Sequence, residues 1–522
     1  MSHSATLLFL LSVFGLSCSP SLQQAASDSN DRPNILFIMA DDHTGQAWGI
    51  YEDLLKAYVK NDNIQRLAQE GTVLDRAFCT NSICVPSRAS IMTGQYSHRN
   101  DIYTLKEGLH PDRTNIAKVM QGAGYQTAII GKWHLKQEPS GFDHYMVLPG
   151  QGRYHNPKLK TKDNWQDGNK GGTDYEGYSA DVIGDHSVEW LKSRESDKPF
   201  FLMTHFKATH GPFDFPERYR SLNADRELPE PESLMDFGPE TTGRHAIGQK
   251  LEEMGRRMES GLAKPNSYWG QAQVQPFSLD GLDSIAARRK IYQTMTKHIL
   301  RGGAAIDDNI GKLLDYLDEA GLAENTVVIY TADQGYFLGE HGFFDKRMMY
   351  EESLRMPFVI RYPREIPAGK RNDDIILNVD FPALFADYAG VETPKFIQGR
   401  SFRENLTGNS PKDWRTAMYY RYWLHETFRP AHFGIRHERY KLIFYYGQGL
   451  GKPGTHQETV EPAWELYDLE LDPNELENRY GSPHYELIVA DLKRQLRWLR
   501  QELGDTDEAY PVMQQILDEH WE

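Results

Sequence analysis

The stretch 34-NILFIMADD-42 is the strongest indication of fold in this sequence. Its residues from Ile35 to Ala40 form an uninterrupted apolar run, which ends abruptly at two adjacent aspartates, Asp41 and Asp42. An apolar run without polar alternation is typical of a strand that is buried on both faces of a sheet. We therefore expect a central strand whose carboxyl end presents two carboxylates.

The same pattern, a short apolar run that ends in polar side chains, recurs three more times along the chain. Helical stretches lie between the runs, for example 62-DNIQRLAQEG-71 and 304-AAIDDNIGKLLDYLDEAG-321. Strands that alternate with helices predict an α/β fold with a large, doubly wound, mostly parallel sheet and helices on both faces. Such sheets bind ligands at the carboxyl ends of their strands. The three further runs end at Lys132 and His134, at Lys207 and His210, and at Asp333 and Gln334.

Changes in composition divide the chain into parts. We expect a catalytic domain over residues 32–390, with a polar insertion at about 212–285 that lies over the sheet edge as a long loop. Over residues 391–522, runs rich in tyrosine and other β formers predict a smaller C-terminal α+β domain with a short antiparallel sheet. A final helix is expected from five apolar residues at helical spacing: Ile488, Leu492, Leu496, Leu499 and Leu503.

The first residues have the pattern of an export signal. The apolar run from Leu7 to Leu16 is too short to span a membrane, and small and polar residues follow it. We predict a signal peptide over residues 1–18, so the mature protein is expected in the periplasm, at the cell surface or secreted. The sequence "GLSC" ending at Cys18 resembles a bacterial lipoprotein cleavage box. Plain secretion and a lipid anchor at Cys18 both remain open.

Charge and cysteine content exclude several classes of protein. The 522 residues include 58 Lys and Arg against 74 Asp and Glu, a net charge of −16, which argues against binding to nucleic acid or to an anionic membrane surface. Only Cys79 and Cys84 remain after the predicted signal, so the chain has no disulfide framework. A Cys79–Cys84 disulfide and two free thiols are the alternatives.

The polar residues at the strand ends suggest a metal site. Asp41, Asp42, Asp333 and Gln334 offer the hard oxygen ligands that Ca²⁺ or Mg²⁺ prefers. Each pair alone could cap a helix, but two pairs on equivalent strand ends favour a metal. The basic and titratable residues beside them have the types needed to hold an oxyanion and to protonate a leaving oxygen. They are Arg88, Lys132, His134, His210 and Lys346.

One motif carries a family resemblance. The stretch 84-CVPSRASIMTG-94 resembles the Cys-x-Pro-x-Arg signature of the type I, formylglycine-dependent sulfatases of the alkaline phosphatase superfamily. Further resemblance runs through "RPNILFIMADD", "GKWHL", "THGP", "TADQG" and "ELYDLELDPNELEN", which together cover nearly the whole mature chain. The resemblance implies a sulfuric ester hydrolase. It also implies that a formylglycine-generating or anaerobic sulfatase-maturating enzyme oxidises Cys84 to Cα-formylglycine (3-oxoalanine).

The resemblance also implies roles for individual residues. In the family one hydroxyl of the hydrated aldehyde attacks sulfur, and the other then releases sulfate and restores the aldehyde, an exit that a thiol lacks. Arg88 is similar to the arginine that steadies the hydrate, Lys132 and Lys346 to the sulfate-binding lysines, His134 to the histidine beside the hydrate, and His210 to the acid for the leaving alcohol. The metal is usually calcium, one ion per chain, and its implied ligands are Asp41, Asp42, modified Cys84, Asp333 and Gln334. Gln334 departs from the more common asparagine.

For the substrate, "FFDKRMMYEESLRMPFVIRYP" and "HFGIRHERYKLIFYYG" resemble bacterial carbohydrate sulfatases, including N-acetylglucosamine-6-sulfatases. We expect a sulfated oligosaccharide or polysaccharide from glycosaminoglycan, mucin or a marine algal polymer such as ulvan. Candidate sugar contacts lie in the insertion and in 419-YYRYWLHETFRPAH-432, for which packing between domains is the alternative. Two rival functions remain: a phosphate or phosphonate ester hydrolase of the same superfamily, and a non-catalytic glycan-binding lipoprotein.

Overall fold

The computed structural model describes residue 1 and residues 32–51, 54–238, 243–245, 247–264, 268–269 and 277–522. The predicted signal peptide and Cys18 therefore lie outside the described residues, apart from the first residue. Within the described part of the chain, no helix has both the length and the apolar character needed to cross a membrane.

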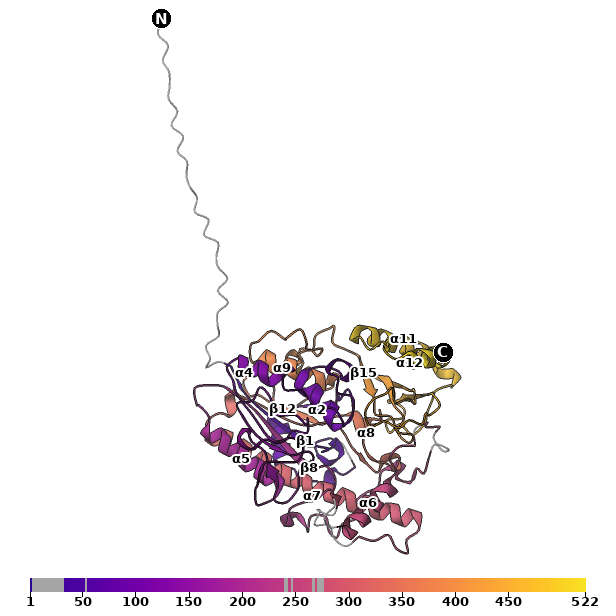
Figure 1. Ribbon diagram of the computed structural model, residues 1–522, viewed down its shortest axis with the longest axis horizontal. Helices are drawn as coiled ribbons and strands as arrows, with labels where there is room; N and C mark the ends of the chain where they lie inside the picture. The colour runs from indigo at the N-terminus through magenta and orange to yellow at the C-terminus, as the bar shows by residue number, and fades with distance from the viewer. Residues whose placement is uncertain (2–31, 52–53, 239–242, 246, 265–267, 270–276) are drawn as a thin grey trace.

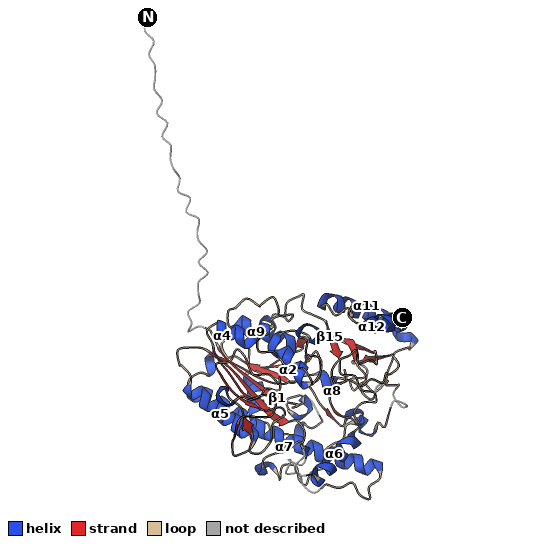
Figure 2. Ribbon diagram, viewed as in Figure 1, coloured by secondary structure: helices blue, strands red, loops and turns tan. Residues whose placement is uncertain are grey.

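A central sheet of eight strands carries the fold, in the order β13-β2-β12-β9-β1-β8-β4-β5. Its core consists of the parallel strands β9, β1, β8, β4 and β5, and β12 runs antiparallel beside β9. Figure 2 shows the strands around β1 in red, with blue helices on either side. All eight residues of β1 are buried, as expected for a strand covered on both faces. The strands are β1 Asn34–Asp41, β2 Thr72–Leu74, β4 Gln126–Lys132, β5 His144–Leu148, β8 Phe200–Thr209, β9 Thr326–Ala332, β12 Phe358–Arg361 and β13 Lys370–Asn372.

Helices cover both faces of this sheet. Alternate residues of β1 pack in opposite directions: Ile35, Phe37 and Met39 join one core cluster, whereas Leu36, Ile38 and Ala40 join the other. Figure 1 shows α2, α4 and α9 on one side of the strands and α5 and α7 on the other. The first face is covered by α2 Cys84–Thr93, α4 Ile116–Gly122 and α9 Phe381–Tyr388, and the second by α1 Asp62–Glu70, α5 Ser179–Ser193 and α7 Ser284–Glu319. The predicted doubly wound α/β fold is confirmed.

The helix expected over 304–321 is the second half of the longer helix α7. Its predicted apolar face is fully buried against the sheet, at Ile306, Ile310, Leu313, Leu314 and Leu317. Periodicity found this half because its apolar stripe is regular.

The insertion differs from the expected loop. Residues Leu251–Ala263 form helix α6, which lies beside α7 in Figure 1. Leu251, Met254 and Met258 are buried in one cluster with Ile291 and Met295 of α7. The prediction of an aperiodic loop was therefore wrong for this segment, because its few apolar residues form a narrow helical stripe among charged neighbours.

The C-terminal part forms a second, antiparallel sheet in the order β15-β16-β17-β18. Its strands are Ala417–Tyr422, His432–His437, Tyr440–Tyr445 and Ala463–Asp468. Two helices follow: α11 Glu486–Leu503 is the expected helix, and α12 Pro511–His520 was not predicted. Gly504, with φ of 73°, ends α11, and Pro511 starts α12 at a position that suits proline.

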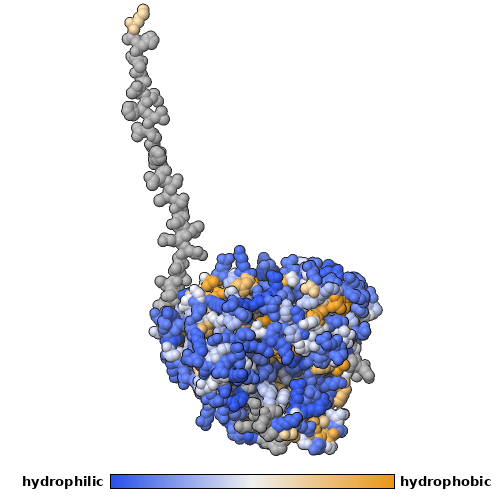
Figure 3. Space-filling model, viewed as in Figure 1, coloured by the Kyte–Doolittle hydropathy of each residue, from blue (hydrophilic) through white to orange (hydrophobic). Residues whose placement is uncertain are grey.

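The tyrosine-rich stretch of this domain is packing surface. Tyr419, Tyr420 and Tyr422 have no exposed area and join the cluster that also covers one face of the large sheet. The structure thus favours packing between the two sheets over direct sugar contact for these three rings. The face seen in Figure 3 is mostly hydrophilic, with hydrophobic side chains in small scattered groups, as expected from the charged composition.

Candidate active site

Four parallel strands deliver polar side chains to one edge of the large sheet. Asp41 ends β1 and Asp42 comes directly after it, and Lys132 ends β4. His210 comes directly after β8, and Asp333 and Gln334 come directly after β9. Strand order places β9, β1, β8 and β4 next to one another. The structure therefore brings these sequence-predicted residues together at the edge where ligands bind in sheets of this kind.

Three buried carboxylates form the centre of the site. Asp41, Asp42 and Asp333 have at most 2% of their area exposed, and each offers an oxygen within 4.8 Å of the others. Burial raises the pKa of Asp42 to about 6 and that of Asp333 to about 7. Burial also opposes ionisation of Asp41, but the charges of Lys132, His210 and Arg88 hold its pKa well below the ordinary value. The cluster thus concentrates negative charge away from water.

These residues fit a calcium ion. Asp41 Oδ1 and Gln334 Oε1 are buried and accept no hydrogen bond from the described residues. Gln334 Nε2 lies 2.5 Å from Asp42 Oδ1 and 2.7 Å from Asp333 Oδ1. A half turn of the carboxamide keeps its shape and exchanges nitrogen for oxygen, which would present a further hard ligand to the cluster. Carboxylate and amide oxygens are the donors that Ca²⁺ takes.

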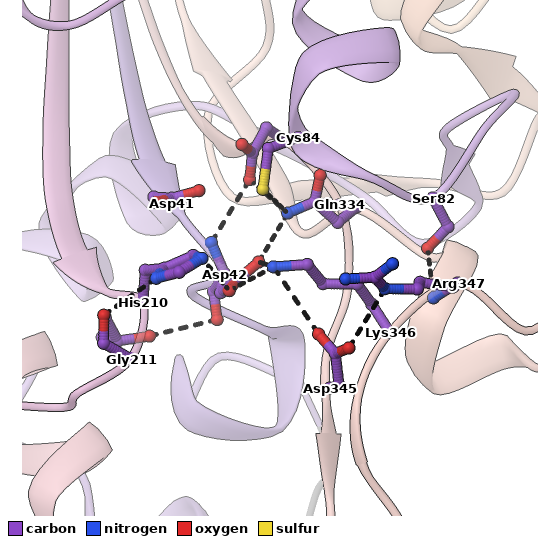
Figure 4. Close-up of polar contacts among 12 residues, drawn as sticks. Asp41, Asp42, Ser82, Cys84, His210, Gly211, Gln334, Asp345, Lys346 and Arg347 are labelled. Carbon is purple, nitrogen blue, oxygen red and sulfur yellow. Dashed lines mark hydrogen bonds and ion pairs between the residues drawn. The ribbon is translucent and has the colours of Figure 1, made fainter. Parts of the chain in front are cut away.

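Cys84 begins α2 beside the carboxylates (Figure 4). Its Sγ lies 3.8 Å from Gln334 Nε2 and within 4.8 Å of ligand atoms of Asp41 and His210. Only 2% of the residue is exposed, and burial raises the pKa of the thiol to about 12. The side chain is therefore a neutral thiol at physiological pH and a weak nucleophile as encoded. Both Cys79 and Cys84 are free, so the alternative of a disulfide between them is wrong.

Arg88 lies one helical turn after Cys84 and links three strands. Its Nε donates to Asp333 Oδ2 at 2.9 Å, and its Nη1 donates to the Lys132 carbonyl at 2.7 Å. Its Nη2 lies 3.8 Å from Asp41 Oδ1. Because the guanidinium is buried and contacts β9 and β4, it fixes the start of α2, and thus Cys84, against the sheet edge.

Two lysines face the carboxylates. Lys132 Nζ pairs with Asp41 and lies 2.5 Å from Gln151 Oε1. Lys346 Nζ lies 2.6 Å and 2.5 Å from the two oxygens of Asp42 (Figure 4). Both lysines are almost fully buried, with at most 3% of their area exposed. They bring two positive charges into the water-poor centre, where an anionic group would be bound strongly.

The two predicted histidines, His210 and His134, differ in position, and both differ from His341, which follows β9 along the chain. His210 Nε2 lies 3.7 Å from Asp42 Oδ2, and burial lowers the pKa of this ring well below its usual value. His134 follows β4 with φ of 57°, an uncommon conformation for a side chain of this size, and its buried Nδ1 has no partner among the described residues. His341 instead stacks on Tyr350, with ring centroids 4.8 Å apart. Its contacts are those of a packed core side chain.

Several residues near the site were missed by sequence reasoning. Gln151 contacts Lys132, and Asp345 and Arg347 flank Lys346, with Asp345 Oδ1 3.9 Å from Lys346 Nζ (Figure 4). Tyr268, from the insertion, approaches His210. Adjacency to Lys346 could have signalled Asp345 and Arg347. No sequence pattern marks Gln151 or Tyr268, because loops bring them to the site.

A cavity of about 380 Å³ adjoins the site through His134. Aromatic and apolar side chains line part of it, including Trp133, Trp165 and Leu148. Lys136 and Asn169 add polar groups to its wall. This volume and mixed lining are in the range of small-molecule pockets.

Comparisons with known proteins agree with this geometry. Residues 33–391 match the family described as Sulfatase, and residues 339–502 match the C-terminal family of N-sulphoglucosamine sulphohydrolase. The chain is 36% identical to an N-acetylglucosamine-6-O-sulfatase of Bacteroides thetaiotaomicron, over 97% of this chain and 92% of that protein. It is 25% identical to an ulvan-active sulfatase of Formosa agariphila, over 94% of this chain and 85% of that protein.

Among solved structures, that of BT4656 in complex with its substrate, D-glucosamine-2-N,6-O-disulfate, matches with a TM-score of 0.82. It is 35% identical in sequence, and the match covers 92% of this chain and 100% of that one. The family match, the sequence identity to the Bacteroides enzyme over nearly the full length and the similarity in fold to BT4656 all lead to the same assignment. The chain belongs to the sulfatase family of the alkaline phosphatase superfamily, and it is a sulfuric ester hydrolase.

Proposed function

We propose that this enzyme removes sulfate from glucosamine units of a sulfated glycan, with the 6-O-sulfate as the group attacked. The observation that carries the proposal is the arrangement around Cys84: a buried residue faces three carboxylates, and Lys132 and Lys346 lie on the same cluster. The glucosamine specificity is supported by the relatives that are named for N-acetylglucosamine 6-O-sulfate or that hold a glucosamine disulfate.

The proposal includes conversion of Cys84 to formylglycine and one calcium ion held by Asp41, Asp42, Asp333, Gln334 and residue 84. When present, the two groups supply a hydroxyl nucleophile and a Lewis acid that neutralises sulfate charge. Because Cys84 is buried and its unmodified thiol is hard to ionise, the maturating enzyme must act before folding is complete.

The chain's own side chains have separate tasks in this proposal. Lys132 and Lys346 bind the sulfate oxygens and stabilise the charge that develops on them. Arg88 holds residue 84 against the sheet edge through its bonds to Asp333 and to the Lys132 carbonyl. His134 is assigned to the surroundings of residue 84. His210, in the form that carries a proton on both ring nitrogens, delivers the Nε2 proton to the leaving sugar oxygen.

We place the sugar toward the cavity that adjoins His134. Trp133 and Trp165 line it. Only 4% of Trp133 is exposed, so the half-buried Trp165 is the ring that could offer a pyranose an apolar surface. A substrate of this size and polarity is met outside the cytoplasm, so we retain export through residues 1–18 in the proposal. The exported protein is either secreted or anchored by a lipid at Cys18. A lipid-anchored protein would need detergent for extraction and would incorporate a labelled fatty acid.

The proposal is tested by sulfate release from protein whose Cys84 conversion has been verified by peptide mass spectrometry. The panel contains glucosamine and N-acetylglucosamine 6-sulfates, the 2-N-sulfate, heparan and mucin fragments, and ulvan oligosaccharides, with Cys84→Ala as the control. Release from the 6-sulfated glucosamines, abolished in the control, is expected. Fully converted wild-type protein that releases no sulfate but hydrolyses phosphate or phosphonate esters with matched leaving groups would contradict the proposal.

A further inference from the structure

We propose that Lys207 and Tyr268 are positioning residues for His210: they hold the Gly211 carbonyl that orients the His210 ring. This inference rests on the proposed function, in which His210 donates a proton to the leaving oxygen. It assigns a task to a buried lysine and to a tyrosine of the insertion that the reaction scheme leaves unused.

The carbonyl of Gly211 is the meeting point of three donors. His210 Nδ1 donates to it at 2.9 Å (Figure 4), and the Tyr268 hydroxyl donates to it through a short hydrogen bond. Lys207 Nζ lies 3.5 Å from the same oxygen and donates to the Tyr268 hydroxyl at 3.0 Å. The Tyr268 oxygen is also 3.3 Å from His210 Nδ1. The ring, the phenol and the ammonium therefore form one small network.

This network determines which nitrogen of His210 exchanges its proton. A backbone carbonyl can only accept hydrogen bonds, so Nδ1 carries hydrogen whether the ring is neutral or charged. The exchangeable proton must then be on Nε2, the nitrogen that lies 3.7 Å from Asp42 Oδ2 in the reaction centre. A rotation of the ring would break the bond to Gly211 and turn Nε2 away from the leaving oxygen.

The side chain of Lys207 makes its hydrogen bonds within this network. The residue is 1% exposed, and among the described residues no carboxylate lies within ion-pair distance of its ammonium group. Its Nζ is 4.5 Å from the centre of the Tyr154 ring. The Tyr154 hydroxyl in turn donates to the His210 carbonyl at 2.5 Å. Since burial of an ammonium group is costly unless its donors are used, its contacts with the His210 surroundings account for its place in the site.

Tyr268 gives the insertion a part in the reaction. The residue lies beyond helix α6 along the chain, and its hydroxyl reaches the Gly211 carbonyl 57 positions away. His210 therefore lies in the turn that follows β8, and a side chain of the insertion holds this turn in place. Loss of either donor is expected to let the Gly211 peptide and the His210 ring move.

The test is a leaving-group series on Tyr268→Phe and Lys207→Met. Each variant is assayed for kcat/KM on aryl sulfates whose parent phenols range from strongly to weakly acidic, and on a 6-sulfated glucosamine. We expect a loss of roughly 3- to 10-fold on the sugar sulfate, in line with the loss of one hydrogen bond. The loss should shrink as the phenol becomes more acidic, because a good leaving group needs little proton donation.

Matched controls come from the part of α7 that contacts α5. Tyr316→Phe removes a half-buried hydroxyl that donates to the Leu191 carbonyl at 3.2 Å, and Lys312→Met removes a surface lysine that pairs with Asp185. Both controls should show no dependence on the leaving group. Lys207→Arg, which restores a donor, should recover part of the activity lost in Lys207→Met, and it replaces Lys207→Met if that variant does not fold.

Each outcome decides the inference. A loss that is equal for all leaving groups, or no loss in Tyr268→Phe, would overturn the positioning role while the sulfatase activity of the wild type stands. Wild-type enzyme with verified Cys84 conversion that cleaves no sulfate ester would instead refute the proposed function. The two failures are therefore distinguishable in one set of assays.

Discussion

Asp333→Asn is expected to make the calcium-free protein more stable at alkaline pH and to remove its response to calcium. Asp333 is fully buried, and burial raises its pKa from 3.8 to about 7, although Arg88 partly offsets this effect. The difference of about 3 pKa units corresponds to about 4 kcal/mol, at about 1.4 kcal/mol per unit. Ionised Asp333 therefore costs the metal-free fold a sizeable part of its stability.

The sign of the pH dependence follows from linkage. Because the folded-state pKa lies above the unfolded value, the stability is fully present below about pH 4 and is lost as pH rises to about 7. Asparagine imitates the uncharged side chain, so in chelator at pH 8 the variant should be more stable than wild type by up to about 4 kcal/mol. At pH 5 the difference should be much smaller. Calcium narrows this difference, because a ligand that only wild type binds stabilises it by about 2.7 kcal/mol at 100 times its Kd and by about 4.1 kcal/mol at 1,000 times its Kd.

The assay is thermal unfolding of wild type and Asp333→Asn, followed by circular dichroism at pH 5 and pH 8, with EGTA or with CaCl₂. The expected result at pH 8 is that the variant has the higher Tm in EGTA and that only wild type gains strongly in calcium, which narrows the difference between the two proteins. Equal calcium-induced shifts in both proteins would remove Asp333 from the ligand set. A variant that is less stable than wild type in EGTA at pH 8 would show that the bond from Arg88 to Asp333 outweighs the cost of burying the ionised carboxylate, and would contradict this prediction.

Four further outcomes are expected. Cys84→Ser should lose sulfate release without a change in circular dichroism, and wild-type rates in this variant would exclude the formylglycine mechanism. His210→Ala should reduce kcat on sugar sulfates by roughly 10²- to 10⁴-fold and on acidic aryl sulfates far less; equal losses would remove His210 as the acid. Trp165→Ala should lower kcat/KM on the saccharide roughly 3- to 10-fold and leave aryl sulfates unaffected, unless the sugar lies elsewhere. Ile310→Ala, in the fully buried face of α7, should lower the free energy of unfolding by about 2–5 kcal/mol with kcat unchanged, as denaturant titration beside an activity assay will show.

Much of the site could be predicted because its residues follow regular strands. The runs that lead to Asp41, Lys132, His210 and Asp333 each begin with a mainly apolar stretch, and parallel strands bring their carboxyl ends to one edge. The signature around Cys84 is local in sequence and needs no tertiary information. Helix α6 was missed because its apolar stripe is narrow. Helix α12 was missed because it is short and because the helical periodicity of α11 ends before it, at Gly504.

The fold class, the sheet edge that carries the site and the Cys84 motif for which we propose modification could all be predicted from the order of residues alone. Three features appear only in the folded chain: Cys84 is buried beside carboxylates, Arg88 bonds to Asp333 across 245 positions, and the Tyr268 hydroxyl donates to the Gly211 carbonyl. The difference lies in how far apart along the chain the interacting residues are. Periodicity and motifs report interactions between neighbours along the chain, whereas burial, pKa and hydrogen-bond partners depend on side chains that meet only after the sheet, its helices and the insertion have packed together.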